Sequence, residues 1–308
     1  MSFFREPGSL MVDRIVVGYA SDEAGRDAVT LAATMATLLG SELTVVFPYQ
    51  PLLSTATAEV VEQRVRAEVG ELTAAIDLPG EPTYHWTPSS WPIHGLHELA
   101  EYEAAQLIVY GAARERLADR LHVSLMERLV HGAPCAVAIA PPGYAEREER
   151  PLRRVGVGFS SSEEGIEVLH VACAFAELTG GSLDVIAGAG LEPALASYAY
   201  SSVSLPEVER EIFEQTEATL ARVTADLDGS VPIERETISG DPVEVLVERS
   251  RELDILMLGS RDYGPLRHAL LGSVSADVMR RASCPVLTLP RGVVRGAALP
   301  AAQERAGG

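Results

Sequence analysis

The sequence predicts an α/β protein made of two tandem Rossmann-like domains, each with a five-stranded parallel sheet flanked by helices. The first observation behind this prediction is an internal repeat that spans most of the 308 residues. The second is the pattern within each half, where short β-branched runs without polar alternation are separated by longer stretches with helical spacing. Such runs are typical of strands that are buried on both faces of a parallel sheet and joined by crossover helices.

The repeat indicates the duplication of a whole domain. Residues 14–18 and 43–46 return as residues 154–158 and 183–186, a shift of 140 positions (154 minus 14). This period is far longer than that of solenoid repeats. We therefore expect domains at 12–142 and 152–290. A linker rich in proline and charge should join them, and a mobile tail should follow at 291–308.

Each half contains five strand-like runs with helical stretches between them. We expect strands near residues 14–19, 42–48, 82–87, 106–111 and 135–140 in the first half, and near 153–158, 182–188, 232–238, 254–259 and 284–289 in the second. Asp22–Leu39 and Leu205–Leu227 carry one apolar face each and predict helices. Gly40 and Gly180 stand where the first helix of each half must end, a usual place for a residue that tolerates positive φ.

Composition excludes several classes of function. The chain has 44 acidic and 25 basic residues and a formal charge of −19, which argues against nucleic acid and anionic membranes as partners. It contains no lysine, the residue that Schiff-base enzymes and phosphate-transfer loops use. Three cysteines are too few for a disulfide framework, and no signal peptide or membrane span is visible. We therefore expect a cytoplasmic protein that is not an enzyme.

The loop after the fourth strand of the second half is the main candidate for a binding site. Ligands of such sheets bind beyond the carboxyl ends of the strands, where the strand order reverses. There the chain runs from Gly259 to Gly272 and Ser273, and a helix begins near Val274. The free N–H groups and the dipole of a helix N-terminus favour an anion such as a di- or triphosphate. The alternative is that Ser273 is only an N-cap and the glycines only turn the chain.

This loop resembles the nucleotide motif of the universal stress protein family, G-x2-G-x9-G-[ST], with Gly259, Gly272 and Ser273 in register. The resemblance covers about residues 13–290 and implies an adenine nucleotide alpha hydrolase-like fold for both halves. It also implies a non-catalytic stress-response protein, and ATP binding where the motif is intact. In this family the last strands pair domains across a two-fold axis. We therefore expect the two halves to form a pseudo-dimer within the chain. A homodimer of whole chains and a protein partner are further expectations, and the sequence does not identify the partner.

The resemblance also assigns individual contacts in the second half. It implies that adenine lies against Val157, Gly158 and Gly188. The residues expected around the phosphates are Gly259, Arg261, Asp262, Gly272, Ser273 and Val274. Ordinary strand packing remains the alternative for Val157.

Several residues depart from the family pattern. Asp262 replaces the middle glycine of the motif, and the acidic residue after the first strand is Ala20 in the first half and Ser160 in the second. In the first half Arg114 and Val123 replace two glycines, and the loop is one residue shorter. We therefore expect ATP in the second domain only and a degenerate site in the first. A nucleotide-free interaction protein remains the alternative.

Two other groups of residues invite a functional reading. His94 and His97 lie three apart on one helical face, but no third ligand pattern accompanies them, so we expect no metal site. Cys135 and Cys284 open the last strand of each half, and we expect them to be buried thiols.

Overall fold

The computed structural model describes residues 11–49, 55–88, 92–112, 129–130, 132–189, 205–225, 227, 229, 231–260 and 273–290. The tail expected at 291–308 lies outside these residues. The five strands of the first half are β1 (Arg14–Gly18), β2 (Glu42–Tyr49), β3 (Thr83–Pro88), β4 (Leu107–Gly111) and β5 (Ala136–Ala140). Those of the second half are β6 (Arg154–Phe159), β7 (Ser182–Ala189), β8 (Ile233–Ser239), β9 (Ile255–Gly259) and β10 (Val286–Leu289). The ten expected strands are thus confirmed to within about two residues at each end.

Helices lie between these strands. Those of the first half are α1 (Glu23–Leu39), α2 (Thr55–Thr73) and α3 (Pro92–Tyr102). Those of the second half are α5 (Glu163–Thr179), α7 (Leu205–Ala225), α8 (Pro242–Arg249) and α9 (Ser273–Arg281). A short 3-10 helix, η1 (Tyr144–Glu146), lies between the halves.

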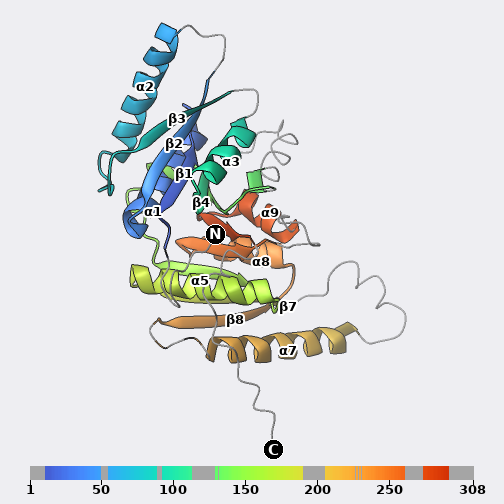
Figure 1. The fold of residues 1–308 in the computed structure, drawn as a ribbon. Coiled ribbons are helices and arrows are strands. Elements are labelled where there is room, and N and C mark those ends of the chain that lie inside the picture. The colour runs from blue at the N-terminus through green and yellow to red at the C-terminus, as the bar shows by residue number, and fades with distance from the viewer. Residues whose placement is uncertain are drawn as a thin grey trace, which may run out of the picture.

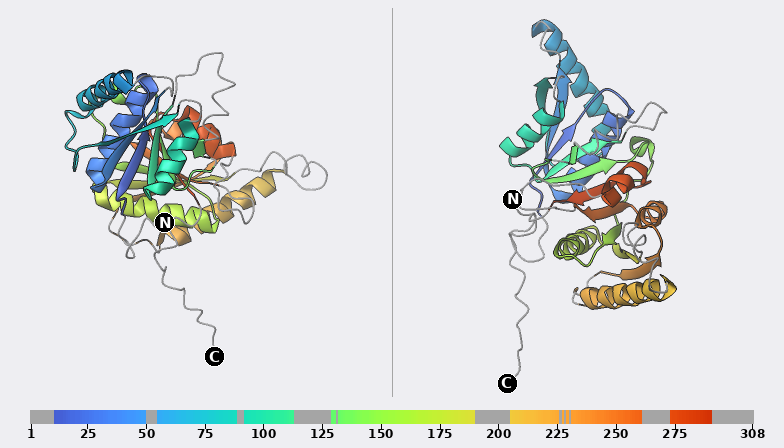
Figure 2. Two further views of the ribbon diagram at one scale, coloured as in Figure 1. Left: turned by 45° about the horizontal axis from the view of Figure 1, so that its top comes forward. Right: turned by 90° about the vertical axis from the view of Figure 1, so that its right-hand side faces the viewer.

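The strands form one ten-stranded sheet with the order β3-β2-β1-β4-β5-β10-β9-β6-β7-β8 (Figures 1 and 2). Strands of the same half pair in parallel, as expected. The halves meet where β5 and β10 pair antiparallel, with Val286 opposite Ile139 and Thr288 opposite Val137. The expected pairing of the two last strands within one chain is therefore present.

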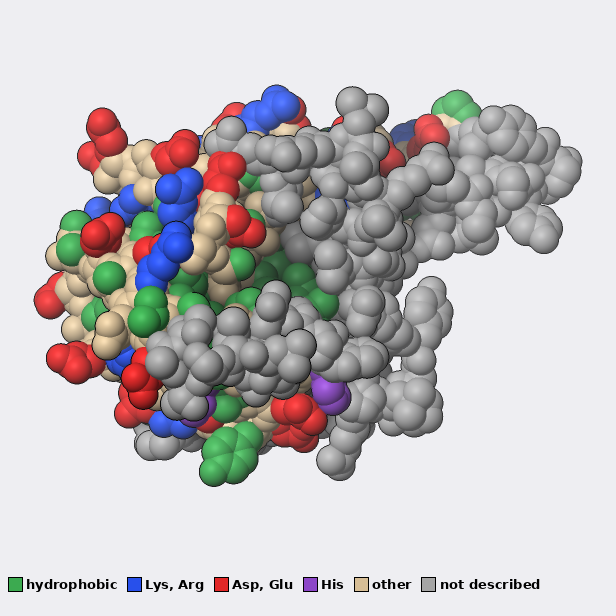
Figure 3. Space-filling model, turned by 90° about the horizontal axis from the view of Figure 1, so that it is seen from above, with side chains coloured by type: hydrophobic (Ala, Val, Ile, Leu, Met, Phe, Trp, Pro, Cys, Tyr) green, Lys and Arg blue, Asp and Glu red, His purple; other side chains and the backbone are tan. Residues whose placement is uncertain are grey.

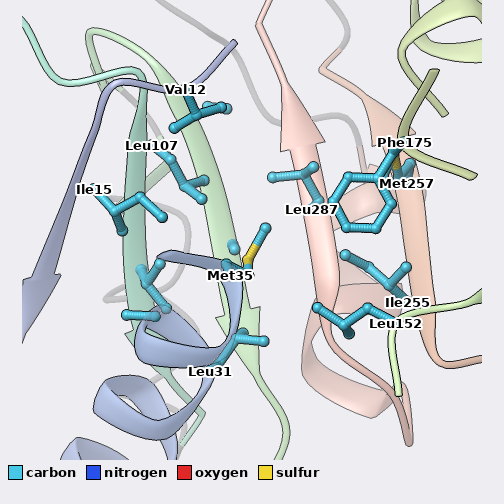
Figure 4. Close-up of a cluster of buried hydrophobic side chains, with 14 of the residues drawn as sticks. Val12, Ile15, Leu31, Met35, Leu107, Leu152, Phe175, Ile255, Met257 and Leu287 are labelled. Atoms are coloured by element: carbon cyan, nitrogen blue, oxygen red, sulfur yellow. The ribbon is translucent and has the colours of Figure 1, made fainter. Parts of the chain in front are cut away.

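The core has two layers, one on each face of the sheet. Ile255 and Met257 of β9 face α5, whereas Leu256 and Leu258 face the layer that contains α8 and α9. All four are buried, which explains why this strand shows no polar alternation. Figure 4 shows the first layer, where side chains of α1 and β4 lie near Phe175, Met257 and Leu287 of the second half. One apolar cluster thus spans both halves.

Local capping explains how the first helix of each half begins and ends. The Asp22 carboxylate accepts from the Gly25 N–H at 2.8 Å, and the Ser162 hydroxyl accepts from the Gly165 N–H at 3.1 Å. Gly40 and Gly180 end these helices with φ values of 68° and 60°, the left-handed conformation expected for them.

Candidate functional site

The carboxyl ends of β6, β7 and β9 form the candidate site of the second half. β6 lies between β9 and β7, so the chain leaves β6 on one side and returns to β9 on the other. This is the reversal of strand order at which open α/β sheets bind ligands. Gly158, Gly188 and Gly259 each lie within a residue of the end of their strand. The expected adenine residues and the start of the expected phosphate loop therefore lie at the same edge of the sheet.

Helix α9 begins beside the end of β9. The Ser275 hydroxyl donates to the Gly259 carbonyl at 3.0 Å, and Ser275 itself is buried. Val278 and Met279 hold the middle of the helix in the core, and Arg281 makes two bonds of 2.7 and 2.8 Å to the Glu244 carboxylate of α8. This pairing lowers the pKa of Glu244. The N-terminus of α9 is thus fixed in position at the edge of the sheet.

The electrostatics at this helix end suit an anion. The first turn of α9 contains no acidic residue. The first N–H groups of a helix have no partner within the helix, and the helix dipole adds partial positive charge there. Ser273 is the first residue of α9, and Val274 follows it at a half-buried position. Arg261, Asp262 and Gly272 lie outside the described residues, so their contacts stay predictions.

The glycines of the site have different physical causes. A Cβ at Gly158 would lie 2.5 Å from the Leu258 side chain, and one at Gly188 would lie 3.1 Å from Pro242. Packing therefore accounts for Gly158. In contrast, a Cβ at Gly259 would meet its nearest neighbour, the Val168 side chain, at an ordinary 3.6 Å. No atom of the described residues would clash with a Cβ at position 259, so packing does not require glycine there.

Val157 is fully buried in the layer that faces α5. Strand packing explains this residue without a ligand, and its contact with adenine stays a prediction.

The turn after β6 shows what replaces the acidic residue of the family pattern. Ser160 is exposed, and its hydroxyl lies 2.9 Å from that of Ser162, the N-cap of α5. Ser162 is therefore the capping group of this turn, and Ser160 bonds to it. A Cβ at Gly165 would lie 2.0 Å from the Ser160 carbonyl oxygen, so the glycine that repeats in both halves allows this turn to close against the helix.

The corresponding edge of the first half contains a carboxylate that the sequence does not reveal. Glu68 of α2 accepts from the Tyr19 and Ser21 hydroxyls at 2.7 Å each, and from Arg64 Nε at 2.7 Å. These three donors lower the pKa of Glu68 to about 2. Burial, together with the bond to Glu68, raises the pKa of Tyr19 to about 12. Helix α2 is thereby fastened to the loop after β1.

In the first half, the backbone of α1 packs directly against the end of β4. A Cβ at Gly111 would lie 1.8 Å from the Ala24 carbonyl oxygen of α1, about half the distance found at Gly259 in the second half. Glycine at 111 is therefore required by the approach of a helix backbone, and the two edges differ physically despite the repeat. Arg114 and Val123 lie outside the described residues.

The histidine pair does not come together as a metal site. His97 Nε2 lies 2.9 Å from the Leu129 carbonyl oxygen, and burial lowers the pKa of His97. His94 pairs instead with Glu98, at 3.2 Å. Within the described part of the chain, no three His, Cys, Asp or Glu side chains are arranged to hold a metal ion.

The three cysteines are buried and form no disulfide, as expected. Burial raises the pKa of Cys135 and of Cys284 to about 12, so neither thiol is poised to act as a nucleophile.

On the face seen in Figure 3, acidic side chains are scattered among arginines over the described part of the surface, and neither charge is concentrated there.

None of the helices in the described part of the chain is both long and apolar enough to cross a membrane.

Comparisons with known proteins agree with this architecture. The model of the universal stress protein family matches residues 11–141 and 151–290. Universal stress protein Rv2319c of Mycobacterium tuberculosis is 27% identical over 295 residues, which cover 90% of this chain and 99% of the relative. Universal stress protein Rv2623 of the same organism is 26% identical over 296 residues, covering 89% and 95%. A crystal structure of a universal stress protein from Archaeoglobus fulgidus has a TM-score of 0.58 at 18% identity, covering 91% and 98%. The structural likeness shows the fold alone.

Proposed function

Because the chain belongs to the universal stress protein family, we propose that it binds ATP or ADP at the carboxyl edge of its second half. Its role is non-catalytic, and nucleotide occupancy changes the surface that it offers to a protein partner or to a second copy. We place it in the cytoplasm, in keeping with three buried cysteines that form no disulfide.

One observation supports nucleotide binding most directly. The Ser275 bond to the Gly259 carbonyl holds the N-terminus of α9 at the end of β9. Packing against the described residues does not explain why position 259 is glycine. A glycine beside an anchored helix N-terminus allows the backbone to approach phosphate closely. The motif spacing from Gly259 to Ser273 supports the same reading.

The restriction to the second half follows from the first half's own contacts. The Ala24 carbonyl of α1 packs on the end of β4, where a Cβ at Gly111 would lie 1.8 Å from it. This close approach disfavours an anionic ligand there. The absence of lysine from the chain supports a binding role rather than phosphoryl transfer.

A nucleotide-free interaction protein is the second candidate, and the turn after β6 favours it. The Ser160 hydroxyl already has a partner in Ser162, and serine supplies no charge where the family pattern has an acid. A ligand would therefore gain little at this position unless the Ser160–Ser162 bond rearranged.

Acid extraction of the purified protein separates the two candidates. Nucleotide binding predicts adenine nucleotide at close to one equivalent per chain, or else a rise in Tm on adding millimolar ATP. ATP at about 100 times its Kd would add about 2.7 kcal/mol to the free energy of unfolding. If the protein releases no nucleotide and ATP leaves its Tm unchanged, the nucleotide-free candidate is correct.

A pair of glycine variants locates the site. Gly272→Val should abolish the ATP-dependent rise in Tm, because a branched side chain would obstruct the phosphates. Gly229→Val is the matched control in the same half, since a Cβ at 229 meets nothing within 4 Å. Equal responses to ATP in the two variants would refute the proposed phosphate loop.

A further inference from the structure

The segment between the two halves contributes two side chains to the packed core. The sequence predicts a linker here, and the structure shows residues 141–151 folded around η1. The Tyr144 side chain is only 1% exposed, and Leu152 is 4% exposed. Both belong to the apolar cluster that includes α1 and β10. The segment is therefore seated between the halves rather than acting as a loose tether.

A buried carboxylate of the first half holds this segment. Asp27 of α1 is 1% exposed, and its two oxygens accept from the Gly143 N–H at 2.8 Å and the Ala145 N–H at 2.7 Å. Burial raises the pKa of Asp27, and the two amide bonds oppose that shift. A buried carboxylate is tolerated when charge-assisted hydrogen bonds satisfy it. The repeat aligns Asp27 with Glu167 of α5, which is half-buried.

Two arginines extend the contacts to the second half. Arg150 donates to the Tyr144 and Ala145 carbonyls at 3.3 and 2.6 Å, which closes the turn on itself. Arg147 donates to the Ser283 carbonyl at 2.5 Å, and its guanidinium carbon lies 5.3 Å from the centre of the Tyr144 ring. Ser283 lies just before β10. A continuous series of contacts therefore runs from α1 to the start of that strand.

These contacts lie at one end of the junction between the halves. The turn begins directly after β5 ends at Ala140, and β10 begins shortly after Ser283. Because the two strands are antiparallel, the end of β5 and the start of β10 are neighbours, with Ile139 opposite Val286. The register pairs only three residues of each strand. A ladder of three residue pairs supplies few hydrogen bonds, so contacts at its ends can add to the stability of the junction.

We propose that Asp27, the turn at residues 143–146 and Arg147 form an interdomain clasp that couples α1 to the start of β10 and stabilises the β5–β10 junction. The clasp explains why a buried acid occupies position 27 but not the equivalent position of the second half. The clasp does not depend on nucleotide binding, because none of its contacts involves a residue of the candidate phosphate loop.

Hydrogen–deuterium exchange of the full chain without added nucleotide tests the clasp. Asp27→Asn keeps the shape of the side chain but presents an N–H₂ group to one of the two amides, and Arg147→Gln removes the bond to Ser283. Each variant should accelerate exchange at least about tenfold in peptides that cover β5 and β10, because the junction opens more often. Strand β7, remote from the clasp, should exchange as in the parent. Glu167→Gln is the matched control and should leave the junction unchanged.

The two variants report on the two ends of the clasp. If Asp27→Asn accelerates exchange only in α1 and residues 143–150, the carboxylate has a local role and the proposal is wrong. If Arg147→Gln leaves exchange in β10 at the parent rate, the coupling to the second half does not exist. Should Asp27→Asn fail to fold, Arg147→Gln decides alone, since its half-buried side chain can be replaced without leaving a buried charge.

Discussion

At the scale of single residues, Glu68 distinguishes the first half from the second. Three donors converge on its carboxylate at 2.7 Å, and it joins α2 to the loop after β1. The sequence could not reveal this role. Tyr19 and Glu68 are 49 positions apart, and a glutamate on an amphipathic helix is typical of a solvated face.

Glu68→Gln should lower the free energy of unfolding by about 2 kcal/mol at neutral pH, since hydrogen bonds to a charged group are lost. The pKa of Glu68 is lowered in the folded state, so its contribution is present above its ordinary value of 4.5 and is lost as the pH falls towards about 2. Urea unfolding should therefore show the difference from the parent narrowing across that window.

Glu62→Gln is the control for this experiment. Glu62 lies on the same helix and pairs with Arg66 four residues later at 2.7 Å, an ordinary surface pair. Its loss should change stability by less than about 0.5 kcal/mol. Equal effects at positions 62 and 68 would show that the Tyr19 and Ser21 bonds contribute nothing.

Two glycines in helices should respond to alanine in opposite directions. A Cβ at Gly25 would lie 1.9 Å from the Ala20 carbonyl oxygen, so Gly25→Ala should destabilise the fold by at least about 2 kcal/mol. A Cβ at Gly70, on an exposed face of α2, meets nothing within 4 Å. Gly70→Ala should therefore stabilise the fold by about 0.5 to 1 kcal/mol. Thermal unfolding measures both effects. A Gly25→Ala variant as stable as the parent would contradict the close approach of Gly25 to the Ala20 carbonyl.

At the scale of elements, strands could be predicted far better than sites. All-apolar runs such as residues 255–258 predict strands that are buried on both faces, and the structure buries every one of these side chains. Site glycines are harder, because a ligand and a packing neighbour select the same residue. Gly158 packs against the side chains of Leu258 and Leu246, and this contact depends on how β9 and α8 pack.

Anchoring of α9 to β9 should affect ligand affinity. Ser275→Ala removes the donor to the Gly259 carbonyl and should weaken ATP binding roughly fivefold, because a bond of about 1 kcal/mol no longer holds the helix N-terminus. Ser275→Thr keeps a hydroxyl and should retain most of the affinity. Calorimetric titration with ATP compares the two variants. An unchanged Kd in Ser275→Ala would show that this anchoring bond does not contribute to ATP binding.

At the scale of the whole molecule, the duplication could be read from the sequence but the seating of the linker could not. The repeat predicts two similar sheets, and the apolar last strands predict that they join. The charged run around residues 146–150 suggests a solvated tether. The position of the segment depends instead on contacts with Asp27, 116 positions from Gly143 in the chain, and with Ser283, 136 positions from Arg147.

One core across both halves predicts one cooperative unfolding transition. Tyr144 and Leu152 pack in a cluster shared by α1 and α5, so neither half can unfold without exposing surface of the other. Differential scanning calorimetry should give a single peak with equal calorimetric and van't Hoff enthalpies. Two resolved transitions would show that the halves are independent domains.

The stoichiometry of ATP binding by isothermal titration calorimetry tests the central claim most directly. We predict one nucleotide per chain, lost in Gly272→Val and retained in Ser124→Ala, which alters the residue of the first half that corresponds to Ser273. Two nucleotides per chain, or one that persists in Gly272→Val, would contradict a site at the N-terminus of α9.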